Sequence, residues 1–315
     1  MSAAIVAVSC CCCALAVVAI AVIYILYKRK LSKTTPAPES GTTPSAPVTG
    51  GGDSTGKFPA GALDGIKSAS GLSDTQIDRI MQLIMNFEQS DTRWWMYYGY
   101  CRALSYDYSK AWRGTTVSLY GATTYNNNPQ SDAARLFKHY GKSIKDLGWK
   151  SDKECCQIPG CKGEKLWTIS TTGKTSDFEA KDIQQLSAPC TFCRTVANLN
   201  NDTAWRTAVW KGFASEYFLP AVAELKKVGI PLKAATVGFV VDWALNEGKS
   251  GMVSGLKKAG KSLTKAVEVR AKSGSCCNGS SANAKKRAQM WGEAISKNPD
   301  LATDVASLAA KFKPT

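Results

Sequence analysis

Two carboxylates in one stretch of the chain have the residue types and the spacing for acid–base chemistry. Glu88 closes a run of apolar residues, Asp107 follows nineteen positions later, and a polar turn, Arg113-Gly114-Thr115-Thr116, comes soon after. A carboxylate held against apolar side chains is expected to have a raised pKa, which is what a general acid needs. Two carboxylates in different environments beside a polar loop therefore indicate a glycoside hydrolase.

The helix that must position Glu88 is predicted to begin at Ser73. Ser73 is followed three residues later by Gln76, which is the pattern of a capping box. The apolar residues that then recur at helical spacing are Ile77, Ile80, Met81, Ile84 and Phe87. Glu88 lies four residues after Ile84 and so on the apolar side. The alternative is a glutamate that is simply solvated or salt-bridged near the end of the helix, which is the commoner situation.

The chain is strongly basic. Its 40 Lys and Arg outnumber 25 Asp and Glu, giving a net charge of +15 and a pI of about 9.3. After position 57, 35 basic residues stand against 23 acidic ones, a net charge of +12. This excess favours an anionic partner such as an acidic polysaccharide or an anionic membrane face, although a basic surface can also serve solubility alone. No basic motif is interleaved with aromatic residues, so nucleic acid is not expected as a partner.

Residues 2–27 contain no charged side chain. Such a run is long enough to cross a bilayer as a helix, and Tyr24 and Tyr27 fall where interfacial aromatic residues occur. A cleaved signal peptide is not favoured, because a positively charged start is missing and Lys28-Arg29-Lys30 follows the run. We therefore expect a single-pass membrane protein whose anchor contacts the lipid bilayer through residues 3–27.

The side of the membrane on which the rest of the chain lies stays open. The basic cluster after the anchor favours the cytoplasmic side. Eight cysteines after position 100 and the glycosylation sequons at Asn201 and Asn278 favour an extracytoplasmic domain. A virion membrane protein of a large DNA virus would reconcile the two signals, and such a virus or an alga is the hypothetical source.

The folded domain is predicted over residues 61–315, in the α+β class but mostly helical. Residues 28–60 are basic and then rich in Thr, Pro, Ser and Gly, which is typical of a disordered tether. Residues 115–125 are β-branched and interrupted by glycine, so they predict a short strand or hairpin. Asp132 is predicted to cap a short helix that ends at Gly141.

Residues 150–200 are predicted to be an irregular insertion that bears cysteines. These are Cys155, Cys156, Cys161, Cys190 and Cys193. Four such thiolates could bind zinc, but the spacing is irregular, and an even number of cysteines favours disulfides whose pairing the sequence does not fix. No metal or cofactor is expected in catalysis.

Helices are predicted again after position 200. Their ranges are 205–227, interrupted by Pro220, then 235–247, 263–270 and 282–297. Asp242 lies in the middle of a nearly all-apolar helix, where an isolated charge would be too costly to bury. Arg270 and Arg287 are its candidate partners.

Taken in order, these segments resemble the chitosanases of glycoside hydrolase family 46, within the lysozyme-like superfamily. The matching segments are Glu88 with Trp94, Tyr98 and Tyr100; Arg113-Gly114-Thr115-Thr116; Asp132 with Leu136 and Tyr140; residues 220–248 with Asp242; Val269-Arg270; and Arg287 with Asn298–Leu301. The resemblance spans roughly residues 70–305 apart from the insertion. It implies a lysozyme-like, two-lobed domain with a small β region.

The resemblance also implies roles for the matched residues. Glu88 would be the general acid, an Asp would activate water from the opposite face so that the configuration inverts, and Thr116 would help to hold that water. The residues expected to contact the sugar are Arg113, Asp132, Trp94 and Tyr98. The residues expected to support Glu88 through salt bridges are Asp242, Arg270 and Arg287.

The chain departs from the family pattern at the base. The family's base lies two residues before the loop arginine, where this chain has Ala111, and the segment before Arg113 is five residues longer. Asp107 is the candidate replacement, provided that the two carboxylates come within the roughly 6.5–9.5 Å of an inverting pair. Asp91 is a second candidate. The family's His-Gly after the central helix is replaced by Asn246-Glu247-Gly248.

The sequence thus predicts a membrane-anchored endo-glycoside hydrolase that cuts a β-1,4-linked, chitosan-like amino-sugar polysaccharide of a cell wall. Because a domain of net charge +12 repels a polycation, a less charged or acidic wall glycan fits its electrostatics better. One alternative is a lysozyme-like muramidase acting on peptidoglycan. Another is a catalytically inactive protein that binds glycans or serves as a structural membrane protein of a virion.

Overall fold

The structure is a computed structural model. It describes residues 57–103, 115–124, 128–150, 167–169, 183–185, 191–273 and 281–314. All of these lie in one compact unit, residues 51–315. Among the residues described, no helix is long and apolar enough to cross a bilayer. The predicted anchor at 2–27 and most of the predicted tether and insertion lie outside the described residues and stay predictions.

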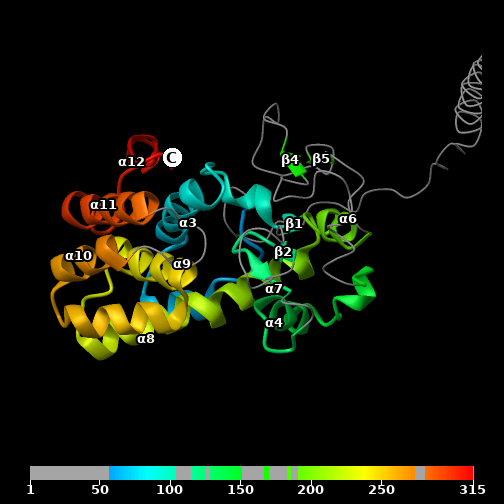
Figure 1. Ribbon diagram of the computed structural model, residues 1–315, viewed down its shortest axis with the longest axis horizontal. Coiled ribbons are helices and arrows are strands. Elements are labelled where there is room, and N and C mark those ends of the chain that lie inside the picture. Colours follow the sequence, from blue (N-terminus) through cyan, green and yellow to red (C-terminus); the bar gives the residue numbers. More distant parts are fainter. Residues whose placement is uncertain are drawn as a thin grey trace, which may run out of the picture. The chain divides into compact units, whose positions relative to one another are not determined.

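The domain is mostly helical and carries two small antiparallel sheets (Figure 1). The helices are α2 (Asp64–Ser70), α3 (Asp74–Glu88), α4 (Asp132–Tyr140), α6 (Thr191–Asn198), α7 (Thr203–Phe213), α8 (Leu219–Val228), α9 (Ala234–Ala259), α10 (Leu263–Ser273), α11 (Ser281–Lys297) and α12 (Ala306–Lys311). The shorter turns are η1 (Trp94–Tyr97), η4 (Lys145–Leu147) and the π-helical η6 (Ala214–Phe218). The strands β1 (Cys101–Ala103), β2 (Thr115–Val117) and β3 (Ala122–Thr123) form one sheet, and β4 (Trp167–Ile169) and β5 (Ile183–Gln185) form the other.

Helix α3 begins at the predicted capping box and ends at Glu88. The Ser73 hydroxyl accepts from the Gln76 backbone N–H at 3.2 Å, and the Gln76 side chain accepts from the Ser73 N–H at 2.9 Å. The predicted apolar face is buried along its length: Ile77, Ile80, Met81, Ile84 and Phe87. Because this face packs on α9, Glu88 is fixed beside the C-terminal helices.

The helices predicted after position 200 are confirmed, and one of them is longer than predicted. The first predicted segment is α7, η6 and α8, with Pro220 in the first turn of α8, where its missing N–H is tolerated. Helix α9 continues beyond residue 247, but Gly248 has φ 77° and ψ 162°, which kinks it sharply. Helices α10 and α11 then cover α9.

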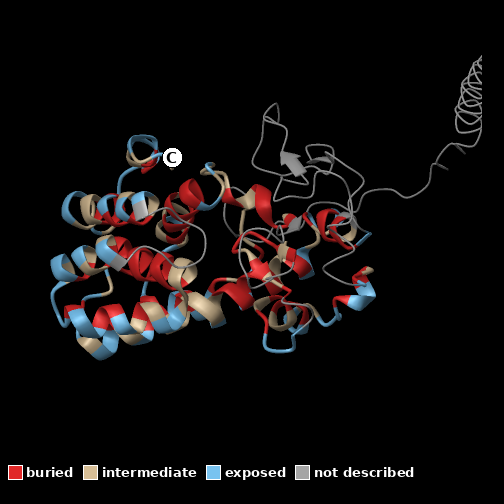
Figure 2. Cartoon of the chain, viewed as in Figure 1, coloured by how far each residue is buried: buried red, intermediate tan, exposed pale blue. Residues whose placement is uncertain are grey.

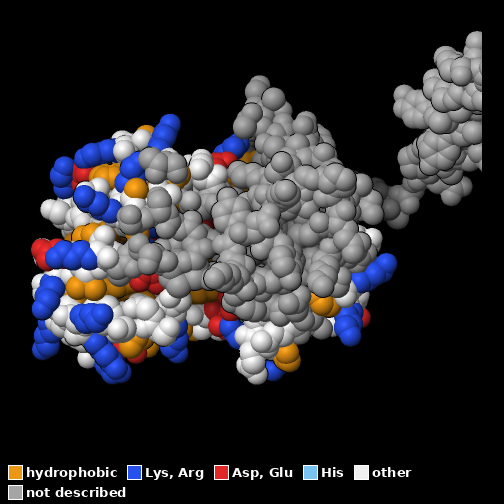
Figure 3. Space-filling model, in the orientation of Figure 1, with side chains coloured by type: hydrophobic (Ala, Val, Ile, Leu, Met, Phe, Trp, Pro, Cys, Tyr) orange, Lys and Arg blue, Asp and Glu red, His pale blue; other side chains and the backbone are white. Residues whose placement is uncertain are grey.

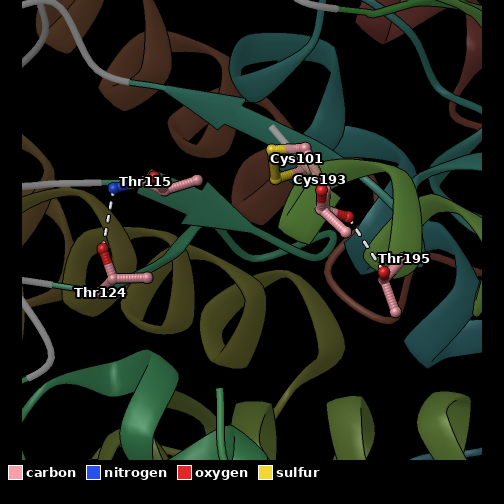
Figure 4. Close-up of a disulfide and its surroundings, with 6 residues drawn as sticks. Cys101, Thr115, Thr124, Cys193 and Thr195 are labelled. Carbon is pink, nitrogen blue, oxygen red and sulfur yellow. Dashed lines mark hydrogen bonds between the residues drawn. A yellow bond between two sulfur atoms is a disulfide. The ribbon is translucent and has the colours of Figure 1, made fainter. Parts of the chain in front are cut away.

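The predicted hairpin is also present. Strands β2 and β3 pair antiparallel with Thr116 opposite Thr123, and Gly121 in the turn between them has φ 72°. Strand β1, which the sequence did not predict, pairs antiparallel with β2. The Thr115 backbone N–H donates to the Thr124 hydroxyl at 2.8 Å and closes the hairpin (Figure 4).

The predicted cap of α4 is wrong by one residue. The Ser131 hydroxyl accepts from the Ala134 backbone N–H at 3.1 Å and is the N-cap. Asp132 is instead the first residue of the helix, where a negative charge is favourable to the helix dipole. The predicted end at Gly141 is confirmed, with φ 76°.

Most elements of the described domain fall into two sets. Helices α3, α8, α9, α10, α11 and α12 form one set of packed helices, and α2 packs on α8 and η6. In the other set, α4 contacts β3 and α7, and α6 contacts β1 of the sheet β1–β2–β3. The helical stretch α7–η6–α8 belongs to both sets and joins them. Figure 2 shows buried residues along the inward faces of both sets.

A disulfide between Cys101 and Cys193 joins β1 to α6 (Figure 4). Both residues are fully buried. Because Cys193 is in a disulfide, it is not a zinc ligand, and at this position the disulfide hypothesis is favoured over the zinc site. The other cysteines of the predicted insertion lie outside the described residues.

Replacing Cys101 and Cys193 together by Ala is expected to lower the free energy of unfolding by about 2–5 kcal/mol, because the bond closes a long loop. Urea denaturation of the full chain measures this loss. Thr195→Ala, a neighbouring change on α6, is the control and should change the free energy by less than about 0.5 kcal/mol. An unchanged urea midpoint for the cysteine variant would contradict the stabilising role.

Candidate functional site

Glu88 has a charged partner. Its side chain is 31% exposed, and its Oε1 accepts a hydrogen bond from Nη2 of Arg287 on α11 at 2.5 Å. Arg287, which the family resemblance implies as a salt-bridge partner of Glu88, reaches the carboxylate from a helix that lies far away in sequence, so the surroundings of Glu88 are not apolar alone. One side of Glu88 is fixed, while its exposure leaves the carboxylate open to solvent.

Arg287 also binds Asp242, so it bridges a buried and an exposed carboxylate. Its Nη1 donates to Asp242 Oδ1 at 2.6 Å. Asp242 Oδ2 accepts from the Trp291 indole N–H at 3.1 Å, and the Arg287 guanidinium lies 5.0 Å from the Phe87 ring centre. Asp242 is thus paired, as its position in an apolar helix predicts.

Burial and neighbouring charges have opposite effects on the pKa values of Asp242 and Arg287. Burial raises the pKa of Asp242, and the nearby arginines, Arg287 first, counter that rise. Burial lowers the pKa of Arg287, but Asp242 and Glu88 outweigh it and leave that pKa above its ordinary value. Arg287 is therefore a permanent cation between two carboxylates.

Arg270 on α10 extends the cluster. It is 1% exposed and forms an ion pair with Glu247, while its Nη2 donates to Asn246 Oδ1 at 2.6 Å. Burial lowers the pKa of Arg270, and the charges of Asp242 and Glu247 act against that fall. Arg270 thus interacts electrostatically with Asp242, while Arg287 supplies the ion pair to Asp242 described above.

Asp132 is held by two side chains at the start of α4. The Tyr217 hydroxyl donates to its Oδ2 at 2.8 Å, and Arg135 Nη2 donates to its Oδ1 at 2.6 Å. Arg135 also pairs with Glu216 at 2.6 Å. Burial and then the charge of Asp132 raise the pKa of Tyr217 well above its usual value, so the phenol remains a donor. Asp132 has a 30% exposed side chain and a fixed orientation.

Trp94 and Tyr98 do not occupy the predicted sugar-binding positions. Both are fully buried. The Trp94 indole N–H donates to Asp78 at 2.7 Å, and the Tyr98 hydroxyl accepts from the Trp210 indole N–H at 2.6 Å. The prediction that these two side chains bind the sugar is therefore wrong. Both are part of the hydrophobic core.

The structure describes only part of the segment that is predicted to hold the catalytic base. Thr116 is partly exposed on β2, whereas Asp107 and Arg113 lie outside the described residues, so their roles stay predictions. Asp91, the second candidate base, receives hydrogen bonds from Arg93 Nη2 at 2.7 Å and from the Tyr97 hydroxyl at 3.3 Å.

The surroundings of Asp91 favour a structural role. Burial acts to raise the pKa of Asp91, but hydrogen bonds from Arg93 and then Tyr97 outweigh it and keep that pKa below its ordinary value. Its oxygens are engaged within the protein, which disfavours the transfer of a proton from water.

The sequence reasoning missed Trp291, Trp243 and the contact made by Glu247. Trp291 follows Arg287 by four residues and so shares its helix face, a signal that was available. Glu247 stood out only as a departure from the family pattern. Its contact with Arg270 depends on how α9 packs against α10, which spacing alone does not reveal.

No family model matches the chain. A chitosanase of Niallia circulans is 33% identical to it over 196 residues, which are 62% of this chain. The chain is similar to a chitosanase. It covers 58% of the length of that relative.

Solved structures of chitosanases are also similar to the chain. The native chitosanase of Bacillus subtilis MY002 matches with a TM-score of 0.49 and 21% identity, covering 74% of this chain and 94% of that one. A glycoside hydrolase family 46 chitosanase of Gynuella sunshinyii, solved in complex with chitotetraose, matches with a TM-score of 0.48 and 15% identity, covering 73% and 92%.

Proposed function

We propose that this chain is a chitosanase-like glycoside hydrolase that cleaves β-1,4-linked amino-sugar polysaccharides of a cell wall by inverting general acid/base hydrolysis. We include in this proposal a membrane anchor formed by residues 2–27, on the strength of their uncharged sequence. The similarity to a chitosanase at 33% identity supports the class of enzyme.

The observation that carries the proposal is the position of Glu88. A partly exposed carboxylate stands at the end of α3 and is held by Arg287, which is itself fixed by the buried Asp242. A general acid must be accessible to the glycosidic oxygen and fixed in orientation, and Glu88 meets both requirements. Glu88 would protonate the leaving oxygen while a second carboxylate activates water on the opposite face of the sugar.

The second carboxylate is proposed to be Asp107. Asp107→Asn is expected to lower kcat by about 10²–10⁴-fold, because a neutral amide cannot accept the proton of the attacking water. Asp91→Asn is the matched comparison, since the Asp91 carboxylate is already bound by Arg93 and Tyr97. Steady-state cleavage rates distinguish the two, and a large loss for Asp91→Asn with a mild one for Asp107→Asn would assign the base to Asp91.

The substrate is tested by release of reducing ends from chitosan, chitin and algal wall, and by clearing of a peptidoglycan suspension. We expect the full chain to cleave an amino-sugar polymer of low positive charge faster than fully deacetylated chitosan, because the domain is itself cationic. Clearing of peptidoglycan alone would favour the muramidase. Binding to a polymer without cleavage would favour a glycan-binding protein, an outcome that Ala111 at the family's base position keeps open.

A further inference from the structure

A buried series of alternating charges leads from Glu88 into the domain. Its members are Glu88, Arg287, Asp242, Arg270 and Glu247. The first four are the residues that the family resemblance singles out. Glu247 stands where the family pattern has histidine, so the inner end of the series is particular to this chain.

The structure holds Glu247 firmly. Its side chain is only 8% exposed, one carboxylate oxygen accepts from Arg270, and the other accepts from the Trp243 indole N–H at 2.8 Å. The kink at Gly248 turns the second half of α9 back over this region. A Cβ added at Gly255 would lie 2.0 Å from the Trp243 ring, so glycine is needed for this close approach.

Glu247 provides a carboxylate partner for the buried charge of Arg270. Arg270 is 1% exposed, and a buried guanidinium without a carboxylate partner is strongly destabilising. Asp242 already forms its ion pair with Arg287. If Glu247 lost its charge, Arg270 would compete with Arg287 for Asp242, and Arg287 is the group that fixes Glu88.

We propose that Glu247 is a positioning residue for catalysis. It satisfies the charge of Arg270, leaves Asp242 to Arg287, and so keeps Arg287 in place on Glu88. This inference rests on the proposed function of Glu88 as the acid, whereas the packing of the charges is independent of that function.

Glu247→Gln tests the proposal, because it keeps size and hydrogen-bonding capacity but removes the charge. We expect kcat to fall by about 10–100-fold, because Glu88 would no longer be held in its productive orientation, with KM within about twofold. Glu268→Gln, on the exposed side of α10, is the control and should leave both constants unchanged. A rise in KM at unchanged kcat would overturn the proposal.

A charge-relocation variant separates positioning from packing. Asn246 also binds Arg270, at 2.6 Å, so the double variant Asn246→Asp/Glu247→Gln moves the carboxylate by one residue without removing it. We expect it to recover most of the lost kcat. A double variant no more active than Glu247→Gln would show that the charge on Arg270 is not what matters.

A second readout works even if the chain cleaves none of the polymers tested. The ¹³C carboxyl resonance of Glu88, assigned through Glu88→Gln, should shift in Glu247→Gln and return in the double variant. An inactive wild-type chain that shows this response loses the proposed function but keeps the coupling. A Glu88 resonance that is unmoved by Glu247→Gln overturns the inference itself.

A separate observation concerns the positive charge of the domain, which is concentrated. Residues 219–297, which comprise α8 to α11, hold 14 basic and five acidic residues, a net charge of +9, while the rest of 58–315 holds only +3. Figure 3 shows Lys and Arg side chains spread over this end of the domain with few acidic ones between them.

Five exposed lysines contribute much of this positive charge. They are Lys226, Lys227, Lys257, Lys258 and Lys261, here called the lysine patch. The first two lie in the last turn of α8 and the next two in the last turn of α9. The Lys261 ammonium lies 4.0 Å from the position of a Cβ built on Gly229, the cap of α8, so it joins the two helix ends.

The negative ends of the α8 and α9 dipoles do not neutralise the positive charge of the lysine patch. The C-terminus of a helix carries about half a negative charge, so two ends offset only a fraction of five ammonium groups. The ion pair described within the patch is Lys227 with Glu224 at 3.7 Å, a weak exposed contact. Lysine is a point charge on a flexible stem, which suits repeated, loosely spaced anionic groups.

We infer that the lysine patch binds an acidic polysaccharide with repeated carboxylate or sulfate groups. A linear polyanion can reach several ammonium groups at once, and the attraction between exposed charges falls with salt. Such binding would hold the enzyme on a wall that contains acidic glycans, apart from the bond it cleaves.

Polygalacturonate is the probe, with binding to the full chain measured by calorimetry at low and high salt. Changing the five patch lysines to Gln should weaken binding by at least about tenfold, since each ammonium contributes to the attraction. The control changes five exposed lysines elsewhere: Lys67, Lys138, Lys142, Lys145 and Lys211. Equal losses in both variants, or binding to phosphatidylserine vesicles but not to the polyuronate, would overturn the inference.

Discussion

Glu88→Gln is expected to lower kcat for polysaccharide cleavage by about 10²–10⁴-fold, because the amide N–H is far too weakly acidic to protonate the leaving oxygen. The substitution keeps the shape of the side chain and an oxygen that can still accept from Arg287. We therefore expect the melting temperature to change little. Release of reducing ends and thermal unfolding, measured on the same preparation, check both parts of the prediction.

Glu293→Gln is a matched control for this result. Glu293 also forms ion pairs, with Lys297 and Lys311, and its side chain is 22% exposed, but it takes no part in the contacts that join Glu88, Arg287 and Asp242. A Glu88 variant that retains wild-type kcat would remove Glu88 from the role of acid. Loss of activity together with unfolding would show that Glu88 is needed for the fold, and the loss would then not support its role as the acid.

Asp242→Ala is expected to lower the free energy of unfolding by about 3–5 kcal/mol, because it removes the buried carboxylate that pairs with the buried Arg287. Arg287 would keep only the partly exposed Glu88 as its ion-pair partner, and the Trp291 indole N–H would lose its acceptor. At about 2–4 °C for each kcal/mol in a domain of this size, the melting temperature should fall by roughly 6–20 °C.

Asp300→Ala serves as the control for Asp242→Ala. Asp300 pairs with Lys233 at 3.1 Å, but both side chains are about half exposed, so the pair should contribute no more than about 1 kcal/mol. Equal melting temperatures for the Asp242 variant and the wild type would mean that the buried pair gives no net stability. Activity should fall together with stability, because Arg287 would lose its ion pair with Asp242 and would hold Glu88 less firmly.

Local sequence signals were sufficient for much of the fold. The capping box of α3, its apolar face and its end at Glu88 are all encoded within sixteen consecutive residues, and the structure has them as expected. The hairpin at 115–125 and the helices after position 200 were found for the same reason. Helical periodicity and turn residues act over short distances, so they can be recognised without knowledge of the tertiary fold.

Signals that depend on long-range packing were misread or missed. Trp94 and Tyr98 have the residue types of a sugar-binding surface, yet Phe58 and Trp210 cover Trp94 from other parts of the chain, with ring centres 4.8 and 5.4 Å away. The cap of α4 was misplaced because Ser131 and Asp132 are both good N-cap residues. The disulfide between Cys101 and Cys193 joins elements whose adjacency the sequence does not state.

The sequence by itself determined that Glu88 ends an amphipathic helix and that Asp242, set in an apolar helix, must find a cation. Both follow from side-chain spacing and from the cost of burying a charge. Only the tertiary structure decided that Arg287 serves both carboxylates while Arg270 turns to Glu247. That choice depends on how α3, α9, α10 and α11 pack together, because an arginine reaches whichever carboxylate the neighbouring helices bring within hydrogen-bond distance.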